Sequence, residues 1–69
     1  MRGKVIKVNH EKGFGFIRGA DGVERFFHKS GLQRTAGVAF EDVAPNMDVE
    51  FEAVDDAPKG PRAMEVLVR

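Results

Sequence analysis

Apolar and acidic side chains alternate between Met47 and Val54 with a period of two residues. One side of an extended chain here carries Val49, Phe51 and Ala53, and the other side carries Asp48, Glu50 and Glu52. This pattern is typical of a half-buried strand, whose inner face joins a core and whose outer face meets water. We therefore expect Phe51 to be a core residue.

Four further segments have the alternation or the composition of strands. The predicted strands cover residues 2–9, 13–18, 24–28, 47–54 and 64–68, the last with Met64, Val66 and Val68 on its apolar face. Residues 20–22 have the composition of a hairpin turn, so the second and third strands should pair antiparallel. A short helical turn is expected at residues 30–33, and longer loops at residues 34–46 and 55–61. Five short strands without a convincing helix predict an all-β fold, a closed or nearly closed barrel.

The second predicted strand presents two rings on one side. Phe14 and Phe16 are two residues apart, so they share a face, and Arg18 continues their row. Ile17 points the other way and is the natural core residue. Gly15 lies between the two rings, where the lack of a Cβ permits close approach of another backbone or of a ligand.

The third predicted strand extends this ring surface if it lies in register with the second. Phe26 and His28 then join the two phenylalanines of the second strand, while Phe27 points into the core. Flat rings beside cations suit a single-stranded nucleic acid, because every base has a stackable face and every linkage a negative charge. An exposed aromatic surface calls for a ligand or a partner.

Two motifs in these strands resemble a known family. KGFGFI at residues 12–17 is similar to the first ribonucleoprotein motif of the cold-shock domain, and RFFHKS at residues 25–30 is similar to the second. The resemblance extends from Gly3 to the Gly60-Pro61 pair. It implies a five-stranded antiparallel β-barrel of the oligonucleotide-binding (OB) fold, formed by residues 1–69 as a single domain. It also implies low-specificity binding of single-stranded RNA and DNA, with a role as RNA chaperone or as regulator of transcription and translation.

The chain departs from the family pattern at three ring positions. Lys7 stands where the family usually has an exposed tryptophan, Val8 where it has the next phenylalanine, and Lys29 where the second motif has its last phenylalanine. A lost base–aromatic contact costs about 1–3 kcal/mol, whereas a lysine adds a phosphate contact that salt weakens. We expect binding that is weaker and more ionic than in a typical member.

The net charge of zero conceals a split along the chain. Residues 1–40 hold eight Lys/Arg and three Asp/Glu, a net charge of +5, and residues 41–69 hold three and eight, a net charge of −5. Two solvated faces are one interpretation of such a split. Both aromatic motifs lie in the positive half, however, so we expect a nucleic acid to bind there and to be repelled by Asp48, Glu50 and Glu52.

The candidate nucleic-acid-binding residues are rings and cations of the two motifs and of the flanking segments. They are Lys7, Lys12, Phe14, Phe16, Arg18, Phe26, His28, Lys29, Phe40, Lys59 and Arg62. Phe40 has two interpretations: alignment with the family's loop aromatic favours a stacking role, and the loop around it fits a plug that pins the loop to the barrel. For His28 the resemblance implies contact with a base. His10 is the only other histidine, and no metal-ligand spacing is present.

Other classes of function find less support in the residues. The absence of cysteine excludes disulfides and cysteine-ligated zinc, and together with the lack of a signal-peptide-like apolar run it leads us to expect a cytoplasmic protein. The only hydroxyl side chains are Ser30 and Thr35, so we predict neither enzymatic activity nor a cofactor, and no membrane or small-molecule ligand. The alternative is a protein-interaction barrel whose phenylalanines bury against a partner or a second copy. The flanking lysines argue against it, because interface cores are depleted in lysine, and we expect a monomer.

Overall fold

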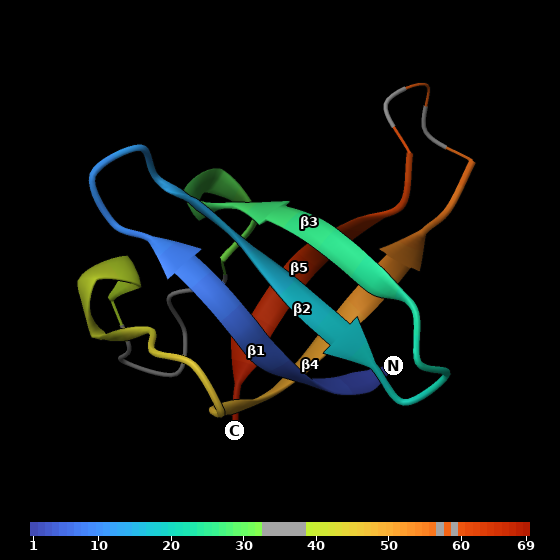
Figure 1. Ribbon diagram of the computed structural model, residues 1–69, viewed down its shortest axis with the longest axis horizontal. Helices are drawn as coiled ribbons and strands as arrows, with labels where there is room; N and C mark the ends of the chain where they lie inside the picture. The colour runs from blue at the N-terminus through green and yellow to red at the C-terminus, as the bar shows by residue number, and fades with distance from the viewer. Residues whose placement is uncertain (33–38, 57, 59) are drawn as a thin grey trace.

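The computed structural model describes residues 1–32, 39–56, 58 and 60–69. Its elements are β1 (Arg2–Asn9), β2 (Phe14–Gly19), β3 (Glu24–His28), the 3₁₀ turns η1 (Lys29–Gly31) and η3 (Phe40–Asp42), β4 (Asp48–Val54) and β5 (Arg62–Val68). The strands close into a barrel in the order β1-β2-β3-β5-β4 (Figure 1). The predicted five-stranded all-β barrel is confirmed, with strand ends within two residues of those expected. Neither of the described helical turns is long and apolar enough to cross a membrane.

The seams between neighbouring strands are not all of one kind. Among the described strands four pairings are antiparallel, and β3 pairs with β5 in parallel. The expected antiparallel barrel is thus antiparallel at four of these seams and parallel at the fifth. Antiparallel neighbours alternate in direction, so a closed ring with an odd number of strands must contain a parallel pair. The β3–β5 seam has one registered pair, Phe26 with Arg62, whereas β1 and β2 share six.

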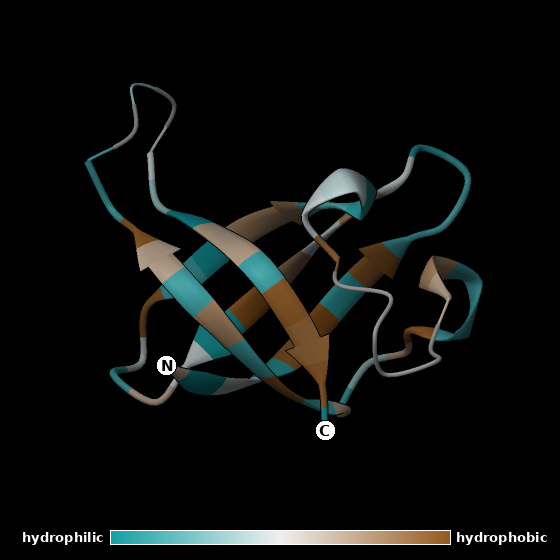
Figure 2. Ribbon diagram, turned by 180° about the vertical axis from the view of Figure 1, so that it is seen from behind, coloured by the Kyte–Doolittle hydropathy of each residue, from teal (hydrophilic) through white to brown (hydrophobic). Residues whose placement is uncertain are grey.

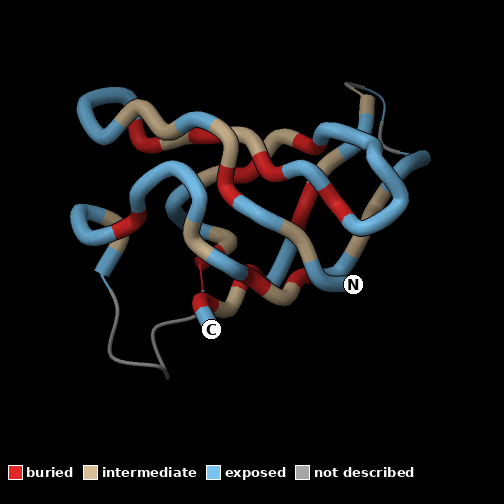
Figure 3. Tube along the Cα trace, turned by 60° about the horizontal axis from the view of Figure 1, so that its bottom comes forward, coloured by how far each residue is buried: buried red, intermediate tan, exposed pale blue. Residues whose placement is uncertain are grey.

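Apolar side chains from alternate strand positions fill the barrel. Ile17 and Phe27 are completely buried and Phe51 is 4% exposed, which confirms the core positions predicted for them. Figure 3 shows buried and exposed positions alternating along the strands, and Figure 2 shows the matching alternation of hydropathy. Gly15 faces inward, opposite Phe27. A Cβ at Gly15 would lie 2.7 Å from the Phe27 ring and 2.6 Å from the carbonyl oxygen of Lys7, so core packing uses the space that the glycine leaves.

A bulge in β1 sets which side chains of that strand face outward. Val5 pairs with Ile17 and Lys7 pairs with Phe16, so Ile6 is an extra residue on β1. The bulge brings Lys7 to the exposed face beside Phe16, while Val8 packs partly buried against the core.

A second irregularity corrects the prediction for the last strand. Met64 does not continue the apolar row of Val66 and Val68, because it is 39% exposed and Ala63 is buried instead. The register of β5 against β4 shifts in this stretch, and Glu65 adopts a positive φ of 50°. The shift inserts one residue into β5 and turns Met64 outward.

Candidate functional site

Four ring side chains lie on the outer face of β2 and β3, and we call them the aromatic patch. They are Phe14, Phe16, Phe26 and His28. Phe14 pairs with His28 and Phe16 pairs with Phe26 in the β2–β3 ladder, and side chains paired in this way project to the same face. All four are partly exposed. The predicted register of the two strands, and with it the common face of the rings, is confirmed.

The three phenylalanines of the aromatic patch contact one another in a compact group. Phe14 and Phe26 are stacked, with ring centroids 5.7 Å apart and planes 26° from parallel. Phe16 stands edge-on to both, with centroids 6.1 Å from Phe14 and 6.0 Å from Phe26. Edge-to-face and offset-stacked rings attract each other, so these contacts hold the three rings in place although they are partly exposed. The patch therefore presents preformed ring surfaces to solvent.

His28 has a defined orientation because it caps η1. The backbone N–H of Ser30 donates a hydrogen bond of 3.1 Å to Nδ1 of His28, and the Ser30 hydroxyl lies 2.9 Å from the same nitrogen. A nitrogen that accepts from an N–H carries no proton, so the neutral ring is protonated on Nε2. His28 thus offers an N–H donor on the side of the ring away from Ser30.

A row of side chains crosses four strands through the middle of the aromatic patch. Lys7 on β1 pairs with Phe16, Phe16 pairs with Phe26, and Phe26 pairs with Arg62 on β5. The guanidinium carbon of Arg62 lies 5.7 Å from the centre of the Phe26 ring, a cation–π contact. The row therefore begins and ends with a cation and has two rings between.

An open pocket lies at the β3–β5 end of this row. Phe16, Phe26, His28 and Arg62 line it, and its volume is about 470 Å³. Its walls combine aromatic faces with N–H donors from the guanidinium and the imidazole. A flat polar ring with acceptor atoms on its edge matches this lining.

The two lysines predicted at the β1–β2 turn and after β3 lie close to the patch. Lys12 is exposed in the turn, where its backbone N–H donates to the side chain of Asn9. Lys29 donates its backbone N–H to the carbonyl of Gly13, and its aliphatic stem passes 2.9 Å from the position that a Cβ on Gly13 would take. Neither ammonium group has an ion-pair partner among the described residues. Lys59, also predicted, lies outside the described residues.

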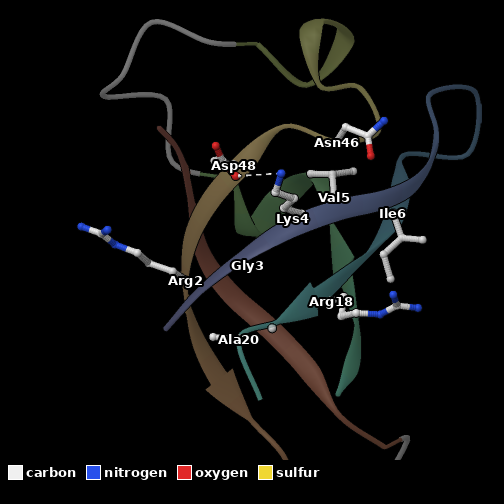
Figure 4. A pocket seen from close by; sticks show the side chains of 10 residues that line it. Arg2, Gly3, Lys4, Val5, Ile6, Arg18, Ala20, Asn46 and Asp48 are labelled. Atoms are coloured by element: carbon white, nitrogen blue, oxygen red, sulfur yellow. Dashed lines mark ion pairs between the residues drawn. The ribbon is translucent and has the colours of Figure 1, made fainter. Parts of the chain in front are cut away.

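Arg18 is one row further along, beside a second hollow of about 470 Å³ formed over β1 (Figure 4). In this hollow Lys4 reaches toward Asp48, and Arg2 and Arg18 point away on opposite sides. The three cations are each within ion-pair distance of a carboxylate: Arg2 of Glu50, Lys4 of Asp48 and Arg18 of Glu24. By contrast, Lys7, Lys12, Lys29 and Arg62 have no ion-pair partner among the described residues. Among the predicted cations that the structure describes, Arg18 is therefore the one that already has a carboxylate partner.

Phe40 lies apart from the aromatic patch. It stands edge-on to the buried ring of Phe27 at 6.1 Å and to His10 at 5.6 Å, and it packs against the core. Nε2 of His10 lies 2.7 Å from the carbonyl oxygen of Val43, which ties this end of the loop to the β1–β2 turn. The plug interpretation describes this geometry, and a stacking role for Phe40 stays a prediction.

Sequence reasoning overlooked Arg25, which is 1% exposed inside the barrel. The signal was available, because Arg25 is two residues before the core residue Phe27 on the same strand. Its guanidinium contacts the carboxylates of Asp21 and Asp55, each at 2.7 Å for the shortest pair of atoms. These hydrogen bonds lower the pKa of Asp21 to about 2, lower the pKa of Asp55, and raise the pKa of Arg25. Hydrogen bonding outweighs the desolvation that opposes each shift.

Metal binding has no candidate within the part of the chain that the structure describes, where no three His, Cys, Asp or Glu side chains converge. His28 is occupied on Nδ1 by Ser30, and His10 faces Val43. The chemistry that the outer face offers is therefore ring stacking, N–H donation and positive charge.

A closed five-stranded barrel with exposed rings beside cations defines a nucleic-acid-binding protein of the OB-fold class. The family model described as 'Cold-shock' DNA-binding domain matches residues 1–68, and the chain belongs to this family, whose members bind nucleic acids. It is 42% identical over 67 residues to Cold shock-like protein CspC of Bacillus cereus, covering 97% of each chain. It is 43% identical over 67 residues to Cold shock-like protein CspC of Escherichia coli K12, covering 96% of this chain and 91% of that protein.

A solved structure named drosophila Unr CSD456 has the same fold. It superposes with a TM-score of 0.75 at 22% identity, covering 99% of this chain and 26% of that one. The barrel fold of this chain is therefore shared with that structure.

Proposed function

We propose that this protein binds single-stranded RNA and DNA with low sequence specificity, by stacking bases on the aromatic patch and pairing phosphates with the cations around it. The observation that carries the proposal is the four-strand row of Lys7, Phe16, Phe26 and Arg62. Two rings lie there between two cations on one exposed face, and within the described residues the cations have no carboxylate partners. A surface of this composition suits a polyanion whose bases are free to stack.

Preference for single strands follows from the kind of contact. A base in a duplex is already stacked and paired, so its face is not free, whereas an unpaired base gains about 1–3 kcal/mol from an aromatic side chain. Every base has such a face, so stacking discriminates weakly between sequences. Bases held on Phe14, Phe16 and Phe26 cannot pair, and weak hairpins would be kept open. We therefore propose a role as RNA chaperone or as regulator of transcription and translation, acting as one domain without enzymatic activity or cofactor.

The proposed phosphate path crosses β1, β2 and the end of β3, near Lys7, Lys12 and Lys29. The acidic outer face of β4 lies elsewhere on the barrel, since β4 neighbours only β1 and β5. On adding oligo-dT, NMR chemical-shift changes should follow β2, β3 and the three lysines. Changes concentrated on β4 would overturn this orientation.

Fluorescence anisotropy of labelled oligo-dT and oligo-U tests the proposal directly. Phe14→Ala, Phe16→Ala and His28→Ala should each weaken binding by about 1–3 kcal/mol, about 5- to 150-fold, with the fold retained because the side chains are half-exposed. Val23→Ala is the matched control, because it removes an apolar side chain that is 39% exposed in the β2–β3 turn, outside the patch.

Melting curves recorded alongside separate lost contacts from lost structure. If the three patch variants bound both oligonucleotides like the parent, the proposed site would be wrong. Burial of the same rings in a concentration-dependent dimer, seen by sedimentation without any oligonucleotide binding, would instead favour the protein-interaction barrel. Location in the cytoplasm and the monomeric state stay predictions.

A further inference from the structure

Arg25 is the one charged side chain buried among the described residues, and all of its donor groups have partners. Nε and Nη2 donate to the two carboxylate oxygens of Asp55 at 2.7 and 2.9 Å. Nη1 and Nη2 donate to the two oxygens of Asp21 at 3.0 and 2.7 Å. Nη1 also lies 3.5 Å from the carbonyl oxygen of Val23, and the guanidinium stands 5.7 Å over the ring of Phe51. Two bidentate forks on one guanidinium fix its position and that of both carboxylates.

The two carboxylates belong to different parts of the barrel. Asp21 is in the turn that joins β2 to β3, four residues from Arg25 and on the same hairpin. Asp55 directly follows β4, and β4 is not a neighbour of β3, because β5 lies between them in the closed order (Figure 1). The fork to Asp55 therefore links β3 to the far side of β5, whereas the fork to Asp21 is local.

The β3–β5 seam that this link spans has few backbone contacts of its own. Phe26 with Arg62 is its single registered pair, and the backbone N–H of Phe26 donates to the carbonyl of Pro61 at 3.2 Å. Val54, next to Asp55, pairs with Arg62 across the β4–β5 ladder. Asp55 thus directly follows Val54, the strand partner of Arg62, and Arg62 is the arginine that lies over the Phe26 ring.

We infer that the Arg25–Asp55 fork positions the nucleic-acid face: it holds the end of the β4–β5 hairpin against β3 and so keeps Arg62 over Phe26. Arg25 and Asp55 are positioning residues, since neither is on the exposed face that would meet a ligand. The inference rests on the proposed function for its consequence in binding, and on geometry alone for the placement of Arg62.

Paired substitutions at the two carboxylates test this inference. Asp55→Asn and Asp21→Asn both replace a carboxylate with an amide of nearly the same shape, and each removes one bidentate ion pair from Arg25. Only Asp55 is attached to the β4–β5 hairpin. Because Arg62 lies over the Phe26 ring, the ring current should shift the Arg62 side-chain protons in the parent. In Asp55→Asn these NMR shifts should move toward unstructured values, and in Asp21→Asn they should stay. This readout needs no oligonucleotide.

Binding gives the second readout, at a temperature where circular dichroism shows every variant folded. Asp55→Asn should weaken oligo-dT binding about fourfold at about 150 mM salt and flatten the salt slope by about 0.7, the contribution of one phosphate contact on a single strand. Arg62→Ala should do the same, and the double variant Asp55→Asn/Arg62→Ala should lose nothing further, because both changes remove one interaction. Asp21→Asn should bind like the parent.

The outcomes separate the two claims. Equal losses of affinity in Asp21→Asn and Asp55→Asn, additive losses in the double variant, or an unmoved Arg62 resonance in Asp55→Asn would each overturn the positioning role. A parent protein that bound no oligonucleotide would overturn the proposed function, and the Arg62 resonances would still decide whether Asp55 holds that side chain.

Discussion

The outer face of β2 and β3 and the outer face of β4 are built by the same alternation, yet their side chains have different partners. On β4, Glu50 lies 3.4 Å from Arg2 and 3.0 Å from Arg69, and Asp48 lies 3.8 Å from Lys4. On β2 and β3 the rings of Phe14, Phe16 and Phe26 contact one another. The cations around them, Lys7, Lys12, Lys29 and Arg62, have no ion pair with a described carboxylate.

This difference separates a face on which Asp48 and Glu50 are paired within the chain from one on which the cations are not. Exposed ion pairs such as those of β4 contribute about 0–1 kcal/mol each and need no ligand. A group of exposed rings with unpaired cations leaves apolar area and charge that a second molecule can use. The closed order also keeps the two faces apart, because β4 does not adjoin β2 or β3. The barrel can therefore attract a polyanion on one side while the other side carries acidic residues.

The largest effect is expected when an acidic residue, as found on the outer face of β4, replaces a ring on the outer face of β2 and β3. Phe16→Glu removes a stacking ring from the middle of the four-strand row and puts a negative charge beside Lys7. We expect oligo-dT affinity to fall about 100-fold, since stacking alone accounts for about 1–3 kcal/mol and repulsion adds to it. Anisotropy titration measures the loss, and an affinity close to that of the parent would show that the ring row does not bind bases.

The converse substitution is the matched control for that variant. Glu52→Phe places a new ring on β4, where Glu52 pairs with Met64 and lies outside the aromatic patch. Its affinity for oligo-dT should be that of the parent, because a single ring that does not continue the pair of Phe16 and Phe26 adds no stacking surface to the row. A gain as large as the loss in Phe16→Glu would mean that ring area alone controls binding.

Adding rings beside the aromatic patch should have the next largest effect. Lys7 lies beside Phe16 and Lys29 lies over Gly13, so Lys7→Trp and Lys29→Phe extend the stacking surface. Affinity at high salt should rise by about 1–3 kcal/mol per ring, and the slope of log K against log salt should become shallower by about 0.7 per lysine removed. Titrations at several salt concentrations measure both quantities. Unchanged affinity and slope in both variants would confine the site to the aromatic patch itself.

Lowering the pH should reveal how much the pairing of a carboxylate with the buried Arg25 stabilises the fold. The hydrogen bonds from Arg25 lower the pKa of Asp21 from 3.8 to about 2, so the folded chain binds this proton more weakly than the unfolded chain. Asp21 therefore stabilises the fold above its unfolded pKa, and this contribution is lost as the pH falls from 3.8 toward 2. Melting temperatures across this range should fall more steeply for the parent than for Asp21→Asn. Parallel curves would show that the Arg25 pair is not formed in solution.

The smallest effect is expected on the acidic face. Glu50→Gln removes the exposed pairs with Arg2 and Arg69, and the free energy of unfolding should change by less than about 1 kcal/mol. Oligo-dT affinity at about 150 mM salt should hardly change, because charges more than about 8 Å apart are screened there. Thermal melts and anisotropy check both points. A large gain in affinity would show that Glu50 acts on the bound strand and that the two faces are not independent.

Much of the site was predictable because it depends on local chain geometry. Alternation assigned Phe14, Phe16, Phe26 and His28 to one face, and the register of β2 with β3 follows from the short turn between them. Arg62 over Phe26 was not predictable in this way. It depends on a parallel seam between strands that are 34 residues or more apart in sequence, and closure of the barrel sets that seam.

The sequence by itself determined which residues face inward and which face outward along each strand, since side-chain direction in an extended chain has a period of two. Phe27 and Phe51 are buried for that reason, and the rings of β2 and β3 are exposed. Only the tertiary structure decided where this period breaks, at the bulge of Ile6 and at Glu65, and which distant residues meet inside the barrel. Arg25 reaches Asp55 because the strands close into a ring, and closure is a relation between segments that no local pattern contains.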